Sequence, residues 1–234
     1  KKNINNIKTI FSEYIIYVFI TLALILYQPD LSSSFIISCI LISMLIIGGL
    51  KIKYFLYILF TGISTLILSI MFYPYMRNRF LNWFSNANPD PSSQMERAKQ
   101  ALHNGGFFGN GFSESIIKEG FMAEGHTDFI LPIIGEEIGF IGILILFLLF
   151  FTFYFISVRV SKMAPDIFSS MFSIGIGFNI LYYFLINAAY VVGLIPPTGL
   201  AIPFISYGGS HTLFTLISVG VLLNISKYCN VYKY

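Results

Sequence analysis

An acidic residue stands where a long polar stretch of this 234-residue chain gives way to an apolar run. The segment reads His126-Thr127-Asp128-Phe129, and the apolar run predicts a helix from residue 129 onward. A carboxylate at such a boundary can act as a general base, which takes a proton from a hydroxyl group during a reaction. The alternative is structural, because Pro132 suits the first turn of a helix and Thr127 or Asp128 could cap its free amides. The residues alone leave both interpretations of Asp128 open.

Two further carboxylates, Glu136 and Glu137, follow inside the apolar run. Ionisable side chains at membrane depth are costly and mark functional sites by default. In a regular helix Glu136 would lie about 12 Å along the axis from Asp128 and about 80° away in azimuth, so the two need not touch. We favour a buried pair that is hydrogen-bonded to neighbouring helices over a direct substrate contact.

Groups that could bind an anion lie upstream, in the polar stretch. Glycines at 105, 106, 109 and 111 could aim backbone amides at a pyrophosphate, as anion-binding nests do. Arg97, Lys99 and Lys118 could neutralise a diphosphate. The alternatives are a flexible connector and solvated surface charges. The spacing of His, Cys, Asp and Glu predicts no metal-ligand cluster.

Two turn-rich motifs lie close together near the C-terminus, Gly193-Leu-Ile-Pro-Pro-Thr-Gly199 and Pro203-Phe-Ile-Ser-Tyr-Gly-Gly-Ser210. Pro and Gly turns separated by only a few apolar residues predict a loop that dips into the membrane face. Irregular backbone at that depth is tolerated only where it is buried in protein or lines a wet cavity. The Tyr-Gly-Gly sequence is poor evidence for a channel filter, because such a filter needs several symmetric copies.

The composition places the elements that carry these residues in a bilayer. The chain is 56% hydrophobic and 11% charged, with a mean hydropathy of +0.77, whereas a soluble domain carries about 25% charged residues. Membrane-spanning helices of about 20 residues are therefore expected. Six are predicted, at residues 10–27, 31–50, 52–73, 129–157, 167–193 and 204–226. The long loop 74–128 separates the third from the fourth and contains a predicted short helix at 94–103.

The basic residues orient these helices. With a cytoplasmic N-terminus, nine Lys and Arg fall on inside segments and five on the outside, all five within the loop 74–128. This asymmetry agrees with the positive-inside rule, so both termini are expected in the cytoplasm and the long loop outside. The net charge of +3 is too small to argue for a nucleic-acid partner.

Read together, the motifs resemble the SEDS (shape, elongation, division and sporulation) family, which includes FtsW, RodA and SpoVE. The matching stretches, in the family's order, are Gln28-Pro29-Asp30-Leu31, the glycine run 105–111, His126–Phe129, Gly135-Glu-Glu-Ile-Gly139, Asn187 and both C-terminal motifs. The resemblance implies an all-α polytopic membrane helix bundle with ten helices. This chain supplies about six of them as one membrane domain, 1–234, so we expect the C-terminal portion of a longer protein. Gln94, Ala98, Ala101 and Lys118 make the resemblance to FtsW stronger than that to RodA.

The resemblance implies a peptidoglycan glycosyltransferase of the bacterial cytoplasmic membrane that polymerises lipid II, with undecaprenyl pyrophosphate as leaving group. It makes Asp128 the catalytic base and assigns the leaving diphosphate to Lys118 and Arg97, a task that a divalent cation, Mg²⁺ or Mn²⁺, could share. The other residues expected to bind substrate are Gly106, Gly109, Gly111, His126, Thr127, Glu136, Glu137, Ser206, Tyr207, Gly208, Gly209 and Ser210. The implied partners are a class B penicillin-binding protein, which cross-links the new strands, and other proteins of cell division or elongation.

Two other functions stay open. A lipid II flippase would use Glu136, Glu137 and Asn187 as a polar path across the membrane. A non-catalytic scaffold would position or activate the transpeptidase. Only the polymerase requires the carboxylate of Asp128 for the formation of glycan strands.

Overall fold

The computed structural model of the chain describes residue 24, residues 31–51, scattered positions between 53 and 83, and residues 94–115, 127–196 and 198–229. Every regular element within these residues is a helix, which confirms the predicted all-α class. The chain divides into two compact units, Lys1–Phe84 and Ser85–Tyr234, and each is described by itself. A single membrane domain over 1–234 and an outward loop over 74–128 stay predictions.

The first unit contributes one continuous described helix, α3 (Leu31–Ile47). Its polar side chains are satisfied within the helix: Ser38 Oγ donates to Ser34 O at 2.7 Å and Ser43 Oγ to Cys39 O at 2.8 Å. Such bonds to the carbonyl four residues earlier let serine lie in an apolar helix. The helix ends three residues before the predicted end of the span 31–50. The predicted span 10–27 lies outside the described residues apart from Leu24, and 52–73 is described only at scattered positions.

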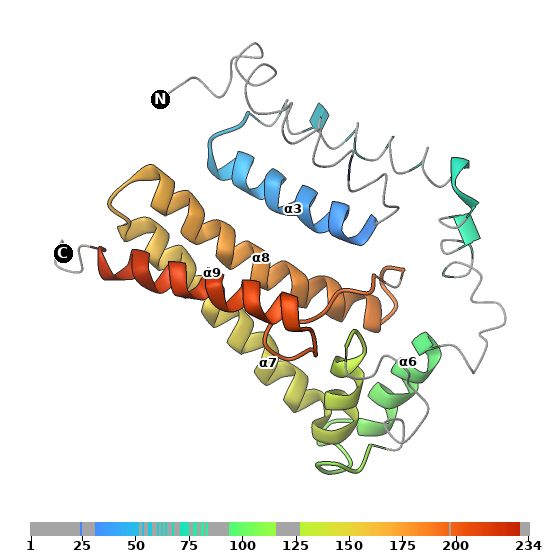
Figure 1. Cartoon of the computed structure of the whole chain (residues 1–234). Helices are drawn as coiled ribbons and strands as arrows, with labels where there is room; N and C mark the ends of the chain where they lie inside the picture. Colours follow the sequence, from blue (N-terminus) through green and yellow to red (C-terminus); the bar gives the residue numbers. More distant parts are fainter. Residues whose placement is uncertain are drawn as a thin grey trace. The chain divides into compact units, whose positions relative to one another are not determined.

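The described residues of the second unit form four helices (Figure 1). They are α6 (Gln94–Gly105), α7 (Ile130–Met163), α8 (Ile167–Val191) and α9 (Gly209–Lys227). The two longest, α7 and α8, pack along each other; α9 packs against both, and α6 packs on the first part of α7. The short connection between α7 and α8 ends at Asp166, the N-cap of α8, whose carboxylate accepts from the Ser169 amide at 2.9 Å. The C-terminal end of α7 therefore lies near the start of α8, and Cys229, just after α9, contacts the last turns of α7 through Sγ, 3.6 Å from Val160 O.

The core of this unit lies between α7, α8 and α9. Phe150 of α7 stacks on Phe184 of α8 with ring centroids 4.4 Å apart and an angle of 8° between the planes. Ile180 and Leu222 are buried in the same cluster. Close approach of α7 and α8 depends on small residues, because a Cβ on Gly177 would lie 2.8 Å from the Ser157 Cβ. Small residues at helix contacts are typical of membrane proteins, where dispersion forces must hold helices together.

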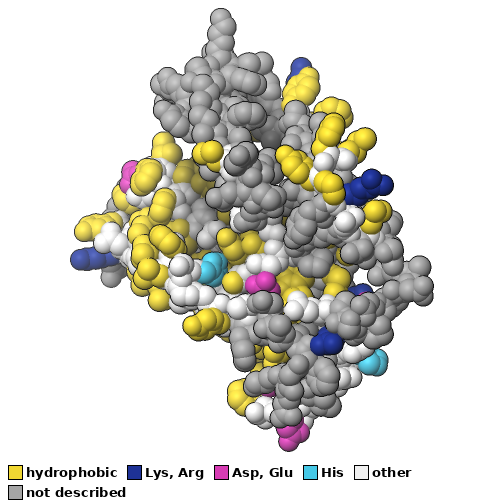
Figure 2. Space-filling view, turned by 45° about the vertical axis from the view of Figure 1, so that its right-hand side comes forward, with side chains coloured by type: hydrophobic (Ala, Val, Ile, Leu, Met, Phe, Trp, Pro, Cys, Tyr) yellow, Lys and Arg dark blue, Asp and Glu magenta, His cyan; other side chains and the backbone are white. Residues whose placement is uncertain are grey.

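Three helices in the described part, α7, α8 and α9, are long and apolar enough to cross a membrane. Large apolar side chains such as Leu148, Leu149 and Phe155 are exposed on α7, as lipid contact requires. On the face drawn in Figure 2, the described side chains are largely hydrophobic and the charged ones are scattered. The molecule is thus a multi-pass membrane helix bundle, as predicted.

The predicted helix boundaries are close but not identical to those observed. The prediction 129–157 becomes α7 at 130–163, and 167–193 becomes α8 at 167–191. The prediction 204–226 starts too early, because α9 begins at Gly209. Residues 201–208 are not helical and contain a turn, in which Ser206 Oγ accepts from the Ile202 amide at 2.8 Å.

Candidate functional site

The first part of α7 contains a break at Gly139. This residue has φ 78° and ψ −169°, which is not helical, and it separates a short N-terminal piece from the long membrane-spanning piece. The amides that follow the break donate to a loop from elsewhere in the chain: Phe140 N to Gly106 O at 3.0 Å and Ile141 N to Phe107 O at 3.3 Å. The break therefore provides a docking place for the glycine loop, residues 105–111.

The glycine loop returns hydrogen bonds to the piece of α7 before the break. Asn110 N donates to Glu136 O at 3.0 Å, and Gly111 N to Glu137 O at 3.1 Å. A Cβ on Gly109 would lie 2.2 Å from Glu137 O, so only glycine permits this close contact between two backbones. The glycine loop is docked on α7, which argues against a flexible connector.

The amides of Gly106, Gly109, Asn110 and Gly111 in the glycine loop are already bonded to the protein. Gly106 N donates to His103 O at 3.3 Å, Gly109 N to Gly105 O at 2.7 Å, and Gly111 N to α7. These bonds argue against the predicted pyrophosphate nest, which needs the amides to point at a ligand. Sequence spacing cannot make this distinction, because a nest and a docked loop require glycine for the same conformational reason.

Glu136 is the most buried acid in the described part, with an exposed fraction of 0%. Asn104 Nδ2 donates to its Oε1 at 3.3 Å, and Ser115 Oγ donates to its Oε2. Glu137 is also buried, with 8% exposed. A buried carboxylate is tolerated when donors surround it, so Glu136 anchors the two ends of the glycine loop to α7. Burial and hydrogen bonding of Glu136 agree with the favoured interpretation for this acid; Asn104 lies on the neighbouring helix α6, and Ser115 follows the glycine loop.

Asp128 is half-buried, two residues before α7 begins. Its carboxylate lies against the first C-terminal motif, since a Cβ on Gly199 would be 3.3 Å from Asp128 Oδ2. The N-cap position of α7 falls at Phe129, whose side chain makes no capping bond. The backbone carbonyl of Asp128 accepts from Asn187 Nδ2 at 2.9 Å and from the Tyr190 hydroxyl. Asp128 thus connects the start of α7 with the end of α8 and the loop that follows it.

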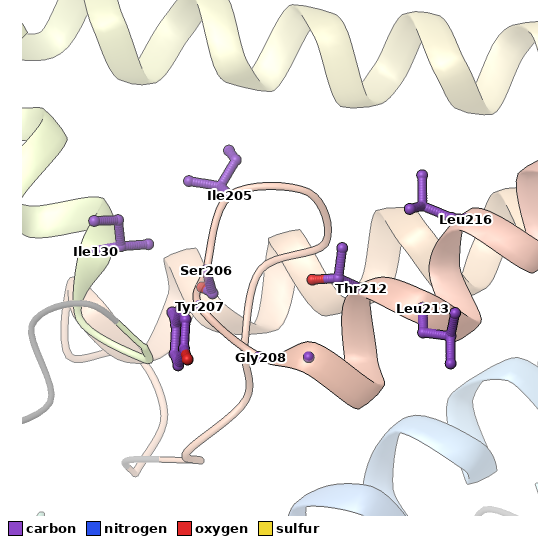
Figure 3. Close-up of a pocket in the computed structure, with 9 residues that line it drawn as sticks. Ile130, Ile205, Ser206, Tyr207, Gly208, Thr212, Leu213 and Leu216 are labelled. Carbon is purple, nitrogen blue, oxygen red and sulfur yellow. The ribbon is translucent and has the colours of Figure 1, made fainter.

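A pocket of about 660 Å³ opens beside this junction (Figure 3). It is lined by Ile130, Ile205, Ser206, Tyr207, Gly208, Gly209, Thr212, Leu213 and Leu216. In Figure 3 the loop 205–208 and the first turns of α9 surround the hollow, with Ile130 of α7 on its other side. Four of the five residues predicted from the second C-terminal motif line this pocket, and Ser210 does not. Most of the exposed lining surface is apolar, and Ser206, Tyr207 and Thr212 add hydroxyl groups, so the pocket suits a hydrocarbon with a few polar atoms.

The basic candidates are only partly described. Lys118 and His126 lie outside the described residues. Arg97 is half-buried on α6. Lys99 forms an ion pair with Glu96 at 2.8 Å, and its Cε lies 3.2 Å from the position of a Cβ on Gly193, at the beginning of the first C-terminal motif. A cation from α6 therefore reaches the same loop that Asp128 reaches from α7.

Within the described residues, no three His, Cys, Asp or Glu side chains are grouped as metal ligands. These residues therefore do not provide a donor set for a divalent cation.

The roles of Tyr190, Asn104 and Ser115 do not follow from the sequence motifs. Asn187 belongs to the motifs of the resemblance, but the motif does not predict its bonds to Asp128 and Leu200. A signal did exist, because a buried Asn in an apolar helix needs polar partners, and the Tyr three residues on lies on the same helix face.

The fold and the site define a class: a multi-pass membrane helix bundle in which an acid at the start of one helix meets a glycine-containing loop beside an apolar pocket. Residues 1–231 match the family model described as cell cycle protein, the FtsW, RodA and SpoVE family. The chain belongs to this family.

Relatives with assigned names support the match. The chain is 36% identical over 221 residues to a protein of Trichlorobacter lovleyi named probable peptidoglycan glycosyltransferase FtsW, covering 92% of this chain and 57% of the relative. It is 35% identical over 231 residues to stage V sporulation protein E of Bacillus subtilis, covering 97% of this chain and 63% of the relative. The chain therefore spans about three fifths of the length of these relatives.

One solved structure has a similar fold. It is described as "Structural coordination of polymerization and crosslinking by a peptidoglycan synthase complex". The TM-score is 0.71 at 23% identity, over 90% of this chain and 60% of the other. This likeness supports the helix-bundle fold.

Proposed function

We propose that the protein to which this chain belongs is a peptidoglycan glycosyltransferase that polymerises lipid II outside the cytoplasmic membrane. The observation that carries the proposal is the carboxylate of Asp128, held against Gly199 beside an apolar pocket. The names of the relatives, probable peptidoglycan glycosyltransferase among them, support the same activity. Because the chain spans only part of those relatives, the activity concerns the full-length protein.

In the proposed reaction the 4-hydroxyl of the acceptor sugar attacks the anomeric carbon of the donor. A carbon–oxygen bond forms, and the bond between the anomeric carbon and the pyrophosphate breaks. Undecaprenyl pyrophosphate leaves with the electron pair of that bond, and Asp128 accepts the hydroxyl proton. A sugar hydroxyl is a weak nucleophile, so a positioned base contributes about 10²–10⁴-fold to the rate.

The leaving diphosphate needs positive charge rather than the loop amides. Arg97 and Lys118 remain the proposed contacts, and Lys99, whose Cε approaches Gly193, is a further candidate cation. Fixed charges at the leaving group stabilise the transition state. The apolar pocket by Ile130 and Leu216 suits part of a prenyl chain, which keeps the lipid in the bilayer while the sugars react.

The proposal includes an orientation and a partner. The two termini of the chain face the cytoplasm and the loop 74–128 faces outward, so that the sugars and Asp128 meet outside. A class B penicillin-binding protein then cross-links the strands, with other division or elongation proteins in the same complex.

The flippase alternative is weakened by one observation. A polar path needs Glu136 to be open to a passing headgroup, whereas Asn104 and Ser115 occupy both its oxygens. No specific observation favours a scaffold. The experiment with labelled lipid II, described next, tests that alternative as well.

The test uses the full-length protein in detergent with labelled lipid II, and the products are separated on a gel. Asp128→Asn is expected to lower glycan formation by about 10²–10⁴-fold while the protein folds and keeps its transpeptidase partner. Asp166→Asn is the matched control, because it makes the same chemical change at an exposed position where Asn also caps a helix. Normal glycan strands from Asp128→Asn would refute the assignment and favour the scaffold.

A further inference from the structure

The backbone carbonyl of Asp128 is held by donors from another helix. Four residues on, where a helix would supply an amide, the chain has Pro132, which has no N–H. Asn187 Nδ2 donates to this carbonyl at 2.9 Å, and the Tyr190 hydroxyl donates to it as well. Both side chains are fully buried, with 0% exposed. They lie one turn apart on α8, with Nδ2 and the hydroxyl oxygen 3.5 Å from each other.

Asn187 also holds the loop on the other side of the Asp128 carboxylate. Its Nδ2 donates to Leu200 O at 2.7 Å, so both amide hydrogens are used on backbone carbonyls. The opposite orientation would set the amide oxygen against two carbonyl oxygens, which fixes the assignment of the two atoms. Asn187 Oδ1 is buried and has no hydrogen-bond partner among the described residues. A buried acceptor without a partner costs free energy, and the two hydrogen bonds that Nδ2 donates offset this cost.

The carbonyls of Asp128 and Leu200 belong to the two backbone segments that lie on either side of the Asp128 carboxylate. Leu200 directly follows Gly199, the residue that Asp128 Oδ2 approaches. The ring of Tyr190 packs edge-on against Phe129, with centroids 5.4 Å apart and an angle of 86° between the planes. The backbone on both sides of the Asp128 side chain is therefore fixed from α8.

We propose that Asn187 and Tyr190 are positioning residues, which hold the carboxylate of Asp128 at the distance from the Gly199 loop that the reaction needs. This inference rests on the proposed function. A displacement of about 1 Å in a reacting group can lower a rate by about 10²-fold, so loss of one donor is expected to reduce turnover without removing the site.

The experiment measures kcat and KM for lipid II with the full-length protein, together with its thermal unfolding midpoint in detergent. Tyr190→Phe removes one hydroxyl and keeps the ring that packs on Phe129. Asn187→Asp keeps the shape and turns the donor toward two carbonyls into an acceptor. Tyr154→Phe is the matched control, because Tyr154 makes its ring contacts with Phe155 and Phe178, away from Asp128.

We expect Tyr190→Phe to lower kcat about tenfold, with KM within about twofold of wild type and an almost unchanged unfolding midpoint. Asn187→Asp should lower kcat further, and Tyr154→Phe should behave like wild type. Normal kcat in Tyr190→Phe, alongside an inactive Asp128→Asn, would overturn the positioning role and leave the proposed function standing. A loss that merely follows a lower folded fraction would also overturn it, since a structural role predicts that result. If wild type itself formed no glycan, the proposed function would fail first.

Discussion

Replacing Gly109 by alanine tests whether the glycine loop is clamped to the break in α7. Gly109 has φ +81°, and an added Cβ would lie 2.2 Å from Glu137 O and 2.6 Å from the Ile138 carbonyl carbon. Real atoms cannot approach so closely, so the loop must move off α7. The matched control is Gly106→Ala in the same loop, because Gly106 has φ +52° and nothing within 4 Å of its added Cβ.

The expected magnitudes follow from the contacts. Left-handed backbone costs a residue with a Cβ about 1–2 kcal/mol, and Gly106→Ala should lose about this much. Gly109→Ala should in addition weaken the hydrogen bonds that join loop and helix. Their donors are Asn110 and Gly111 on one side and Phe140 and Ile141 on the other. At about 0.5–1.5 kcal/mol each, four bonds contribute about 2–6 kcal/mol, which gives a total of about 3–8 kcal/mol for local opening.

Hydrogen exchange on the full-length protein in detergent measures this opening directly. Peptides from 105–115 and 136–142 should exchange much faster in Gly109→Ala than in Gly106→Ala, while peptides from α8 stay protected. The unfolding midpoint reports whether the whole bundle is affected. Equal exchange in the two variants would refute the clamp, because the steric difference between them would then have no consequence.

Two further predictions concern the α7–α8 pair. The bonds from Ser169 lower the pKa of Asp166 below its ordinary value of 3.8. The stabilisation by this cap is therefore complete above about pH 3.8 and is lost as the pH falls through the lowered pKa of the folded state. Hydrogen exchange in the first turn of α8 should become faster in that pH range in wild type. It should not change there in Asp166→Ala, which lacks the cap at every pH. Gly177→Val should lower stability by about 1–3 kcal/mol in thermal unfolding, because its side chain would push α7 away, whereas Gly220→Val, with nothing within 4 Å, should not.

Hydropathy was sufficient to predict the membrane helices of the second unit, because burial in lipid requires long apolar runs. It could not predict the break at Gly139, since Gly-containing apolar helices are usually continuous. The late start of α9 depends on a side-chain-to-backbone bond between Ser206 and Ile202, which forms only once the turn is folded. Local sequence sets helix content, and contacts between distant segments set the ends.

The candidate site was predicted only in part. The position of Asp128 just before α7 followed from an acid at a polar–apolar boundary, and the irregular backbone of the second C-terminal motif before α9 followed from its Pro and Gly residues. The partners of Glu136 lie 21 and 32 residues away along the chain, too far for spacing arguments. The bonds from Asn187 and Tyr190 to Asp128 span 59 and 62 residues, so only the folded chain reveals them.

Backbone hydrogen bonds hold the docked glycine loop on α7, whereas Phe108 of the loop and Phe112, which directly follows it, are largely exposed. Phe108 and Phe112 have exposed fractions of 78% and 84%. Their identity can change without disturbing the hydrogen bonds that hold the loop, so both positions are suitable for a spectroscopic label. A cysteine at 112 would carry a dye or spin probe, once Cys39 and Cys229 are replaced by serine, and would record in real time whether the loop stays in place during turnover.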